Sequence, residues 1–452
     1  MSRELYVRNS PKLIRAWAMY DWANSVYSLT IATAIFPIYY SEITSAINNG
    51  IVHILGRQYT NDALYSYTVS ASFLAVAVLS PLLAPLADQQ RNKLAFLQFF
   101  CYLGALSCGL LFFFQGSNLG WGLGCFGLAS FGFASSLVYY NAFLKDIADE
   151  RFHDRISAWG YSLGYAGSVI LLILNLLLIL RHDWFGLADS SQATRISFIA
   201  VGVWWVLFAQ IPFYALRRFQ QHSTHHRPGT KLLTAGYRRL RHVYNEVKKH
   251  PELRRYLIAF FFFNAGVQTV MYLASLYGAE IIFRDDPQGT VKLIGCVLAI
   301  QLIAIGGAQL FWRLSARKGN APALLIAIIL WMCISAFAYF INTEYEFYAV
   351  AVLVGLVMGG TQALARSTYA KLIPTRSDSA SFFSFFDATE KIATVAGTAL
   401  FGLVADFSGE LRNVSWMLFL LFASGGLLLW PLQRVSVLRP LGKTALQQPS
   451  IT

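Results

Sequence analysis

Two oppositely charged side chains lie inside strongly apolar stretches of this sequence. Arg366 belongs to GGTQALARSTYAKLIP (359–374), and Asp21 belongs to AWAMYDWANSVYSLTIATAIFPIYY (16–40). An arginine on an isolated helix at the centre of a bilayer costs at least ~2.5 kcal/mol. Such charges therefore need partners or a water-filled cavity, and they commonly mark solute or proton pathways.

Arg366 is a candidate ligand for a carboxylate, because a guanidinium offers two parallel N–H donors. Gln362 precedes it by four residues and Tyr369 follows it by three, so the three side chains share a helix face. An amino acid, a short peptide, an organic acid or a phosphate ester would fit such a face. In the alternative interpretation, Arg366 lies only about 8 Å below the membrane surface and snorkels to it or makes a structural ion pair.

Asp21 lies next to a second polar helix face. Tyr20, Asn24 and Tyr27 follow one another at steps of four and three, and we predict that this face lines the cavity. Asp21 is then a protonatable coupling group. The alternative is a structural partner for Arg366 or Lys391.

A further charged group occupies SFFSFFDATEKIATVAGTALFG (381–402). Asp387 and Lys391 are four residues apart with the acid first, a favourable helical pair, and Glu390 and Lys391 lie about 14–15 Å deep. Helix pairing and ligand contact or ion coupling both remain open for these residues. The remaining candidates for solute binding are polar residues of neighbouring apolar stretches: Tyr140, Asn141, Asn264, Gln268 and Tyr272.

The elements that carry these residues are predicted to be membrane-spanning helices. The chain has 452 residues, 56% hydrophobic and only 13% charged, whereas soluble domains carry about 25% charged residues. Its apolar runs reach membrane-spanning length and do not alternate in polarity, which favours helices over a barrel. We predict twelve spans, at about 14–40, 66–87, 93–115, 119–144, 156–180, 195–216, 254–283, 291–312, 321–341, 346–371, 381–405 and 412–433.

Basic residues predict the orientation of these spans. Of the 36 Lys and Arg residues, 28 fall on the side of the termini, six fall in the opposite loops, and Arg366 and Lys391 lie within spans. Both termini are therefore expected in the cytoplasm, with the protein in the cytoplasmic (inner) membrane. The first span follows a basic arm without a cleavage site and is expected to be retained. The net charge of +13 reflects this topology, so we expect no nucleic-acid partner.

Three regions are expected: a six-helix half at 1–216, a basic linker at 217–253 and a second six-helix half at 254–452. Within the linker, Leu233, Tyr237, Leu240, Tyr244 and Val247 form one face of a helix. That helix lies either on the anionic membrane surface or on the protein. His222, His225 and His226 are interpreted as part of a solvated linker, and we expect neither a metal site nor a cofactor.

The segment APLADQQRNK (84–93) resembles the loop signature between the second and third helices of the major facilitator superfamily. Asp88 matches its acid and Lys93 one of its bases, while Ala84 and Arg91 replace its two glycines. The resemblance implies that Asp88 belongs to a gate between the two halves. The corresponding segment of the second half, RLSARKGN (313–320), lacks the acid.

Several longer segments resemble the vacuole effluxer family of that superfamily, whose fungal members are the autophagy-related twenty-two type. Besides the segments quoted above, they are YYNAFLKDIA (139–148), RISAWGYSLGYAGS (155–168) and FFFNAGVQTV (261–270). The resemblance implies an all-α transporter with two six-helix halves, and helices one, four, seven and ten around a central cavity. It thereby places Asp21, Asn141, Asn264 and Arg366 around one cavity. Ala265 stands where the family is expected to carry an Asp, so no role of that acid is carried over.

We therefore expect a secondary transporter, not an enzyme. It would move a small polar or zwitterionic solute, and an amino acid is the solute that we favour. Protons are the expected coupling ion. No Walker A loop and no HExxH motif occurs. A transport-inactive receptor or scaffold, or a lipid-handling protein, is the alternative. The expected partners are the solute, protons and membrane lipids, and we expect a monomer.

Overall fold

The computed structural model describes residues 6–45, 51–54, 57–90, 92–116, 118–221, 232–284, 288–375 and 378–438, and nearly all of them are helical. The first bundle contains α1 (Pro11–Val26), π-helical turns at Tyr27–Ile35, α2 (Phe36–Ser45), α3 (Asn61–Gln89), α4 (Lys93–Leu110), α5 (Leu119–Ile147), α6 (His153–Leu180) and α7 (Ser190–Gln221). A short antiparallel hairpin of β1 (Ile51–Ile54) and β2 (Arg57–Thr60) precedes α3. The hairpin was not predicted.

The second bundle follows α8 (Leu232–Lys249). It contains α9 (Pro251–Tyr277) with π-helical turns at Gly278–Ile282, α10 (Gly289–Lys318), α11 (Asn320–Ala338), α12 (Glu344–Leu372), α13 (Ser379–Ser408) and α14 (Val414–Leu429). Helix starts follow local chemistry. Ser10 caps the start of α1, where its side chain accepts a hydrogen bond from the Leu13 amide and Pro11 occupies the first helical position. Thr343 and Glu346 form a capping box at the start of α12.

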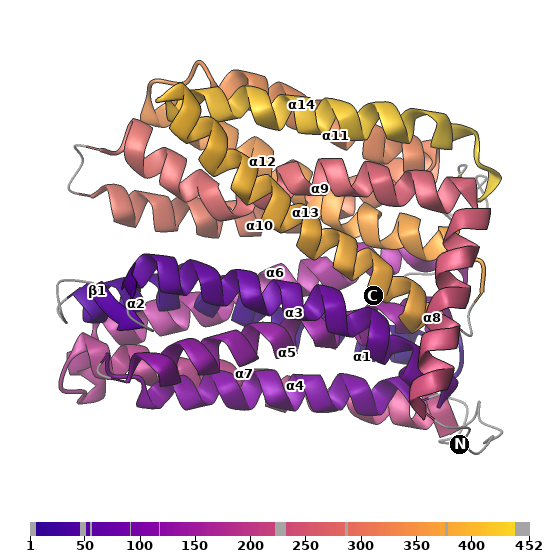
Figure 1. The fold of residues 1–452 in the computed structure, drawn as a ribbon, viewed down its shortest axis with the longest axis horizontal. Coiled ribbons are helices and arrows are strands. Elements are labelled where there is room, and N and C mark those ends of the chain that lie inside the picture. Colours follow the sequence, from indigo (N-terminus) through magenta and orange to yellow (C-terminus); the bar gives the residue numbers. More distant parts are fainter. Residues whose placement is uncertain are drawn as a thin grey trace.

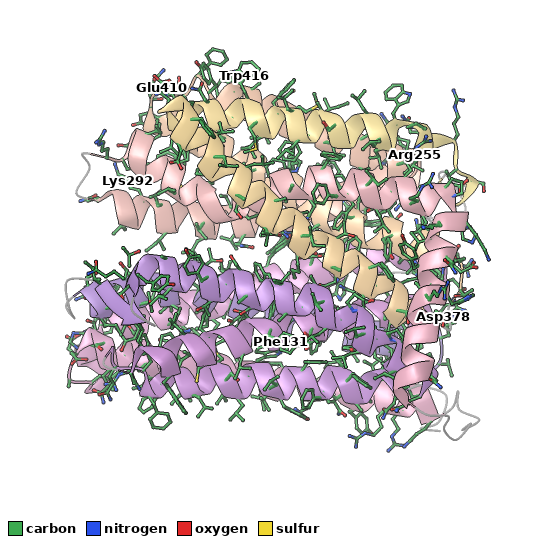
Figure 2. All side chains as sticks on the ribbon, in the orientation of Figure 1. Phe131, Arg255, Lys292, Asp378, Glu410 and Trp416 are labelled. Carbon is green, nitrogen blue, oxygen red and sulfur yellow. The ribbon has the colours of Figure 1, made fainter. Side chains whose placement is uncertain are left out.

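The helices have the lengths that the apolar runs predict. Ten of the described helices are long and apolar enough to cross a membrane. Two further helical segments, α1 to α2 and α9 with its π turns, occupy the first and seventh predicted spans. Figure 2 shows labelled charged residues at both ends of the bundles, including Arg255 and Lys292, with Phe131 between them.

The two bundles lie side by side, with α1 to α7 in one and α9 to α14 in the other (Figure 1). At one end, α8 runs across both bundles, close to both described chain termini; we call this the α8 end. The opposite end carries the β-hairpin and is called the hairpin end. Between α10 and α12, Gly307 and Gly359 allow close approach, since a Cβ at either would collide with the backbone of the other helix.

Helix α8 packs on the protein through Val243 and Val247, which are both buried, whereas Tyr244 is exposed. Two residues of the predicted apolar face therefore point in different directions. The side chains of Leu233, Tyr237 and Leu240, and all of His222, His225 and His226, lie outside the described residues.

Candidate functional site

Asp21 of α1 and Arg366 of α12 form an ion pair that joins the two bundles. Arg366 Nη1 lies 3.1 Å from Asp21 Oδ2, and the side chains are 2% and 5% exposed. The Tyr140 hydroxyl of α5 donates to the same carboxylate oxygen at 2.7 Å. The two charges singled out in the sequence are therefore each other's partners.

The rest of the guanidinium is held by the first bundle. Arg366 Nε donates to Ser157 Oγ and Nη2 to the Ser157 carbonyl, both at 2.9 Å, and Nη1 also donates to Asn141 Oδ1 at 3.3 Å. A desolvated charge is tolerated when its donors are satisfied, and here each guanidinium nitrogen has an acceptor. Arg366 is thus bound in the interface and does not snorkel to a membrane surface.

Aromatic rings enclose the ion pair. The Arg366 Cζ atom lies 4.2 Å from the ring centre of Tyr161 and 5.2 Å from that of Trp17. Trp17 in turn stacks on Tyr140 with ring centres 4.3 Å apart. Tyr161 is partly exposed whereas Trp17 and Tyr140 are buried, so Tyr161 covers the pair on its more accessible side.

Gly160 is required by the closeness of α6 to this pair. A Cβ at Gly160 would collide with Asp21 Oδ2 and lie 2.9 Å from Arg366 Nη2. We predict that Gly160→Ala separates the two charges and lowers the free energy of unfolding by about 1–3 kcal/mol, as overpacking does. Thermal unfolding of the purified protein, followed by tryptophan fluorescence, measures this.

Gly124→Ala in α5 is the matched control, because a Cβ there meets no atom within 4 Å. It should leave the melting temperature unchanged or raise it slightly. Equal destabilisation by the two substitutions would contradict the predicted role of Gly160.

A first latch between the bundles, at the α8 end, consists of Asp88, Lys93 and Ser381. Asp88 accepts hydrogen bonds from the Ala380 and Ser381 amides at 3.2 and 2.7 Å, and from Ser381 Oγ at 2.6 Å. An anion is favoured at the helix N-terminus that these amides form. Lys93 Nζ lies 3.5 Å from Asp88 and 2.8 Å from Asp146. Asp88 thus lies at a contact between the two bundles, and its role in a gate stays a prediction.

Lys145 of α5 bonds to the end of α12, just before the segment that leads to α13. Its ammonium donates to the Ala370 carbonyl at 3.2 Å and to the Ile373 carbonyl, at the C-terminus of α12. Cations stabilise helix C-termini. The first bundle therefore contacts two helix ends of the second bundle: Lys145 binds the C-terminus of α12, and Asp88 binds the N-terminus of α13.

A second latch consists of Asp154, Asn320 and Lys371. Asp154, at the start of α6, accepts from Lys371 Nζ at 2.8 Å and from Asn320 Nδ2 at 2.6 Å. It also accepts from Ser315 Oγ at 2.7 Å. Asp154 and Lys371 are both buried, so these bonds form away from solvent.

The segments NAFLKDI (141–147) and STYAKLI (367–373), at the ends of α5 and α12, resemble each other, and this weak repeat relates the two latches with acid and hydroxyl exchanged. Superposing Lys145 on Lys371 places Asp88 within one residue of Ser315 and Asp154 within one residue of Ser381. In the first latch the acid comes from the end of α3, and in the second it comes from the start of α6. The acid missing from 313–320 is thus supplied by the opposite bundle.

Polar residues lie between the bundles at mid-depth. The Tyr165 hydroxyl of α6 donates to Gln362 Oε1 of α12 at 2.6 Å, and Gln362 Nε2 lies 3.1 Å from the Met271 sulfur. Tyr161, Gln268 and Gln362 are partly exposed. We call Tyr161, Tyr165, Gln268 and Gln362 the chamber floor. The described hydrogen bonds between bundles lie from this level to the α8 end.

A second charged cluster lies beside the floor on α13. Lys391 Nζ is 2.7 Å from Glu390 Oε1 and 3.9 Å from Asp387 Oδ1. Gln268 Nε2 donates to Glu390 Oε1 at 3.4 Å, and Lys391 lies 5.4 Å from the ring centre of Phe73 in α3. Asp387 and Lys391 thus approach each other along the helix, and Lys391 also contacts the first bundle.

Other predicted site residues point into the bundles. The Tyr27 hydroxyl bonds to Ser130 at 2.8 Å, and Tyr20 packs against Phe213. The Tyr369 hydroxyl donates to the Phe382 carbonyl at 2.5 Å. The predicted face of Tyr20 and Tyr27 therefore turns into the first bundle and Tyr369 into the second.

The remaining predicted residues are Asn24, Asn264 and Tyr272. Asn24 and Asn264 are buried, and each Nδ2 atom has no hydrogen-bond partner among the residues that the structure describes. The side chain of Tyr272 lies outside the described part of the chain.

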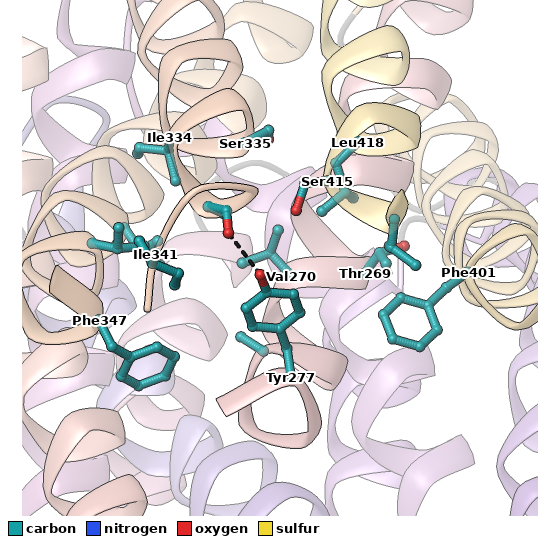
Figure 3. A pocket seen from close by; sticks show the side chains of 15 residues that line it. Thr269, Val270, Tyr277, Ile334, Ser335, Ile341, Phe347, Phe401, Ser415 and Leu418 are labelled. Carbon is teal, nitrogen blue, oxygen red and sulfur yellow. Dashed lines mark hydrogen bonds between the residues drawn. The ribbon is translucent and has the colours of Figure 1, made fainter. Parts of the chain in front are cut away.

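An apolar cavity of about 80 Å³ lies within the second bundle, away from these charges. Figure 3 shows Thr269, Tyr277, Phe347 and Phe401 around it, with the Tyr277 hydroxyl bonded to a backbone carbonyl. Its lining carries no ionisable side chain except that tyrosine. The cavity therefore offers no site for a charged solute.

One sequence motif of α6 is shared with hydrolases. GYSLG (160–164) matches G-x-S-x-G, whose serine acts from a sharp strand-to-helix turn. Here the segment lies inside α6, and Ser162 bonds to Ile305 and Gln309 of α10. The motif serves helix packing between bundles.

Sequence reasoning missed several residues of this interface: Lys145, Ser157, Gly160, Tyr161, Asp154, Asn320 and Lys371. The match between NAFLKDI and STYAKLI pointed to Lys145 and Lys371 as related positions. For Ser157 and Gly160 no such signal exists, because a small residue in an apolar helix is ordinarily a packing residue.

Comparison with known proteins identifies relatives over nearly the whole chain. The family model "Vacuole effluxer Atg22 like" matches residues 9–436. The "Uncharacterized MFS-type transporter YxiO" of Bacillus subtilis is 30% identical over 413 residues, which cover 91% of this chain and 92% of that protein. Autophagy-related protein 22 of Yarrowia lipolytica is 26% identical; the match covers 59% of this chain and 48% of that protein. These matches confirm the resemblance seen in the sequence.

Solved structures confirm the fold. The transporter FucP in its outward conformation aligns with a TM-score of 0.68 at 13% identity, over 94% of this chain and 98% of FucP. A bacterial homologue of the iron transporter ferroportin in its outward-facing state gives 0.66 at 12% identity, over 93% and 98% of the two chains. The fold is that of the major facilitator superfamily, whose members are transporters and not enzymes.

Proposed function

This chain belongs to the vacuole effluxer Atg22-like family of MFS-type transporters. From that premise we propose that it moves a small polar or zwitterionic solute by alternating access, and an amino acid is the solute that we favour. In this proposal it works as a secondary transporter in the cytoplasmic membrane. Bundles 1–216 and 254–452 rock against each other about the chamber floor, with 217–253 as the linker.

The observation that carries this proposal is the asymmetry of the contacts between bundles. The Asp21–Arg366 pair and both latches hold the α8 end closed. The partly exposed polar side chains of the chamber floor lie further toward the hairpin end. A rocking transporter requires a state in which one end is closed and a polar region at mid-depth is reached from the other end. With both termini in the cytoplasm, as the basic residues predict, this state faces outward.

The proposed solute contacts follow from which groups are free to bind. Arg366 is engaged by Asp21 and Ser157 in this state, so the solute first meets Tyr161, Gln268 and Gln362 of the chamber floor. Opening of the α8 end separates Arg366 from Asp21. The guanidinium then becomes available for a solute carboxylate.

Counterflow of labelled leucine into proteoliposomes that contain unlabelled leucine tests the function. We expect uptake that saturates and that exceeds uptake by protein-free liposomes. A panel of amino acids, dipeptides and organic acids extends the test to the wider solute class. Binding without counterflow for every solute would favour the transport-inactive receptor, scaffold or lipid-handling alternative.

Gln362→Ala is predicted to weaken solute binding in a protein that still folds, with a somewhat lower melting temperature because the Tyr165 hydroxyl loses its acceptor. Gln362 is partly exposed on the chamber floor and offers an amide that a polar solute can use. Loss of one hydrogen bond of about 1–1.5 kcal/mol should raise the KM for leucine counterflow about tenfold. Gln210→Ala is the control, since Gln210 is an exposed residue of α7 bonded to Tyr102 within the first bundle. An unchanged KM in Gln362→Ala would remove this residue from the solute site.

A further inference from the structure

The cluster on α13 carries one more acid than base. Lys391 Nζ lies 2.7 Å from Glu390 but 3.9 Å from Asp387, so its hydrogen bond goes to Glu390. Gln268 supplies a second donor to Glu390. Glu390 is thus compensated, and the negative charge of Asp387 is the surplus of the cluster.

Asp387 is also incompletely bonded. The residue is 5% exposed, and its Oδ2 atom has no hydrogen-bond partner among the described residues. A buried carboxylate in this condition costs free energy unless a cation reaches it. Because the side chain is buried in this state, bulk water does not relieve that cost.

The groups around Asp387 come from four helices. Glu390 and Lys391 lie on its own helix, and Gln268 of α9 donates to Glu390. From α5, the hydroxyl of Tyr139 is close enough for the charges of Asp387 and Asp88 to act on it, and it has no hydrogen-bond partner within the described structure. From α3 come Asp88, which is held by Lys93 and Ser381, and Phe73 against Lys391. Lys391 is therefore the basic residue in ion-pair contact with Asp387 among the described residues.

Asp21 differs in this respect. It receives Arg366 and the Tyr140 hydroxyl, so its charge is already compensated by protein groups. A cation added to Asp21 must displace Arg366. A cation that reaches Asp387 Oδ2 displaces no hydrogen-bond donor of the described residues, and Lys391 stays bonded to Glu390.

We propose that Asp387 is the binding site of the coupling cation, a monovalent ion that is either a proton or Na⁺. This inference rests on the proposed transport function and assigns its ion site. The carboxylate takes the cation from the chamber and is neutralised, and it releases the same cation on the other side after the bundles rock. Because Lys391 of this cluster lies 5.4 Å from the ring centre of Phe73 in the first bundle, neutralisation changes the charge at a contact between bundles.

The test combines a binding measurement with transport. The melting temperature of the purified wild-type protein is measured against pH without Na⁺, and against Na⁺ at high pH. We expect it to rise as the pH falls if the cation is a proton, or as Na⁺ increases if it is Na⁺. Asp387→Asn, which is neutral already, should melt at or above the wild-type temperature at high pH and lose this dependence. Asp406→Asn, an exposed acid of the same helix, is the control that keeps it.

In proteoliposomes, Asp387→Asn should retain leucine counterflow, which needs no ion gradient, and lose stimulation of uptake by the gradient that stimulates the wild type. Asp406→Asn should keep both. The assignment is overturned if Asp387→Asn melts with the wild-type cation dependence or keeps the stimulation. A wild type that responds to neither ion in either measurement overturns it as well. Absence of wild-type counterflow, with the melting response intact, rejects the transport function but leaves the cation site supported.

Discussion

Replacement of Arg366 by alanine is expected to abolish leucine counterflow and to destabilise the protein. The substitution leaves Asp21 buried with the Tyr140 hydroxyl as its remaining donor, and it removes the two hydrogen bonds from the guanidinium to Ser157. Breaking a buried ion pair by removing one partner costs about 3–5 kcal/mol. We therefore expect a clear fall in melting temperature together with loss of transport.

A double variant separates lost stability from lost function. Asp21→Asn combined with Arg366→Gln removes both charges and should recover much of the melting temperature, because no unpaired charge remains. Its counterflow should stay low, since the carboxylate ligand proposed above is gone. Arg313→Ala, at an exposed arginine of α10, should change neither quantity. Wild-type counterflow in the folded double variant would exclude Arg366 from the solute site.

Removal of the two latch acids is expected to shift the protein toward the state that is open at the α8 end. Asp88→Asn weakens the bonds to the Ala380 and Ser381 amides, and Asp154→Asn leaves Lys371 without its carboxylate. Each closed-state contact should lose about 1.5–3 kcal/mol. Each substitution thus shifts the population about tenfold to a hundredfold, and the two should be roughly additive because the latches lie on different helices.

Labelling of a cysteine in the closed interface measures this shift. Ala158 is fully buried between the bundles beside Ala308 and Ala363, so Ala158→Cys in a background without the five native cysteines reports opening of the α8 end. The labelling rate should rise in each latch variant and most in the double variant. Asp183→Asn, at an exposed acid of the hairpin end, should leave it unchanged. Equal rates in all variants would mean that the latches do not determine which state is populated.

These predictions assign different tasks to charges that look alike in the sequence. Asp88 and Asp154 hold bundle contacts through helix ends and lysines, Asp21 neutralises an arginine, and Asp387 carries the uncompensated charge. The distinction depends on what each carboxylate touches. It does not follow from residue type or depth in the membrane.

The sequence by itself determined the helices, their membrane character and the family. Uninterrupted apolar length predicts a spanning helix because lipid cannot satisfy a free backbone, and this rule holds whatever the neighbouring helices are. The pairing of Asp21 with Arg366 was also predictable as one alternative, since two opposite charges that cannot stay in lipid have few other partners. The strands β1 and β2 escaped prediction, because a run as short as IVHI carries too little pattern to identify a strand.

Only the tertiary structure decided which way each polar face points. Helical periodicity groups Tyr20 with Tyr27, and Gln362 with Tyr369, but it contains no information on the surface that a face meets. In the fold, Tyr20 and Tyr27 turn into the first bundle, while Gln362 meets Tyr165. The partners Asp21 and Arg366 are 345 positions apart, and Asp154 and Lys371 are 217 apart. Such contacts arise from the packing of two bundles against each other, and local sequence does not encode the register of that packing.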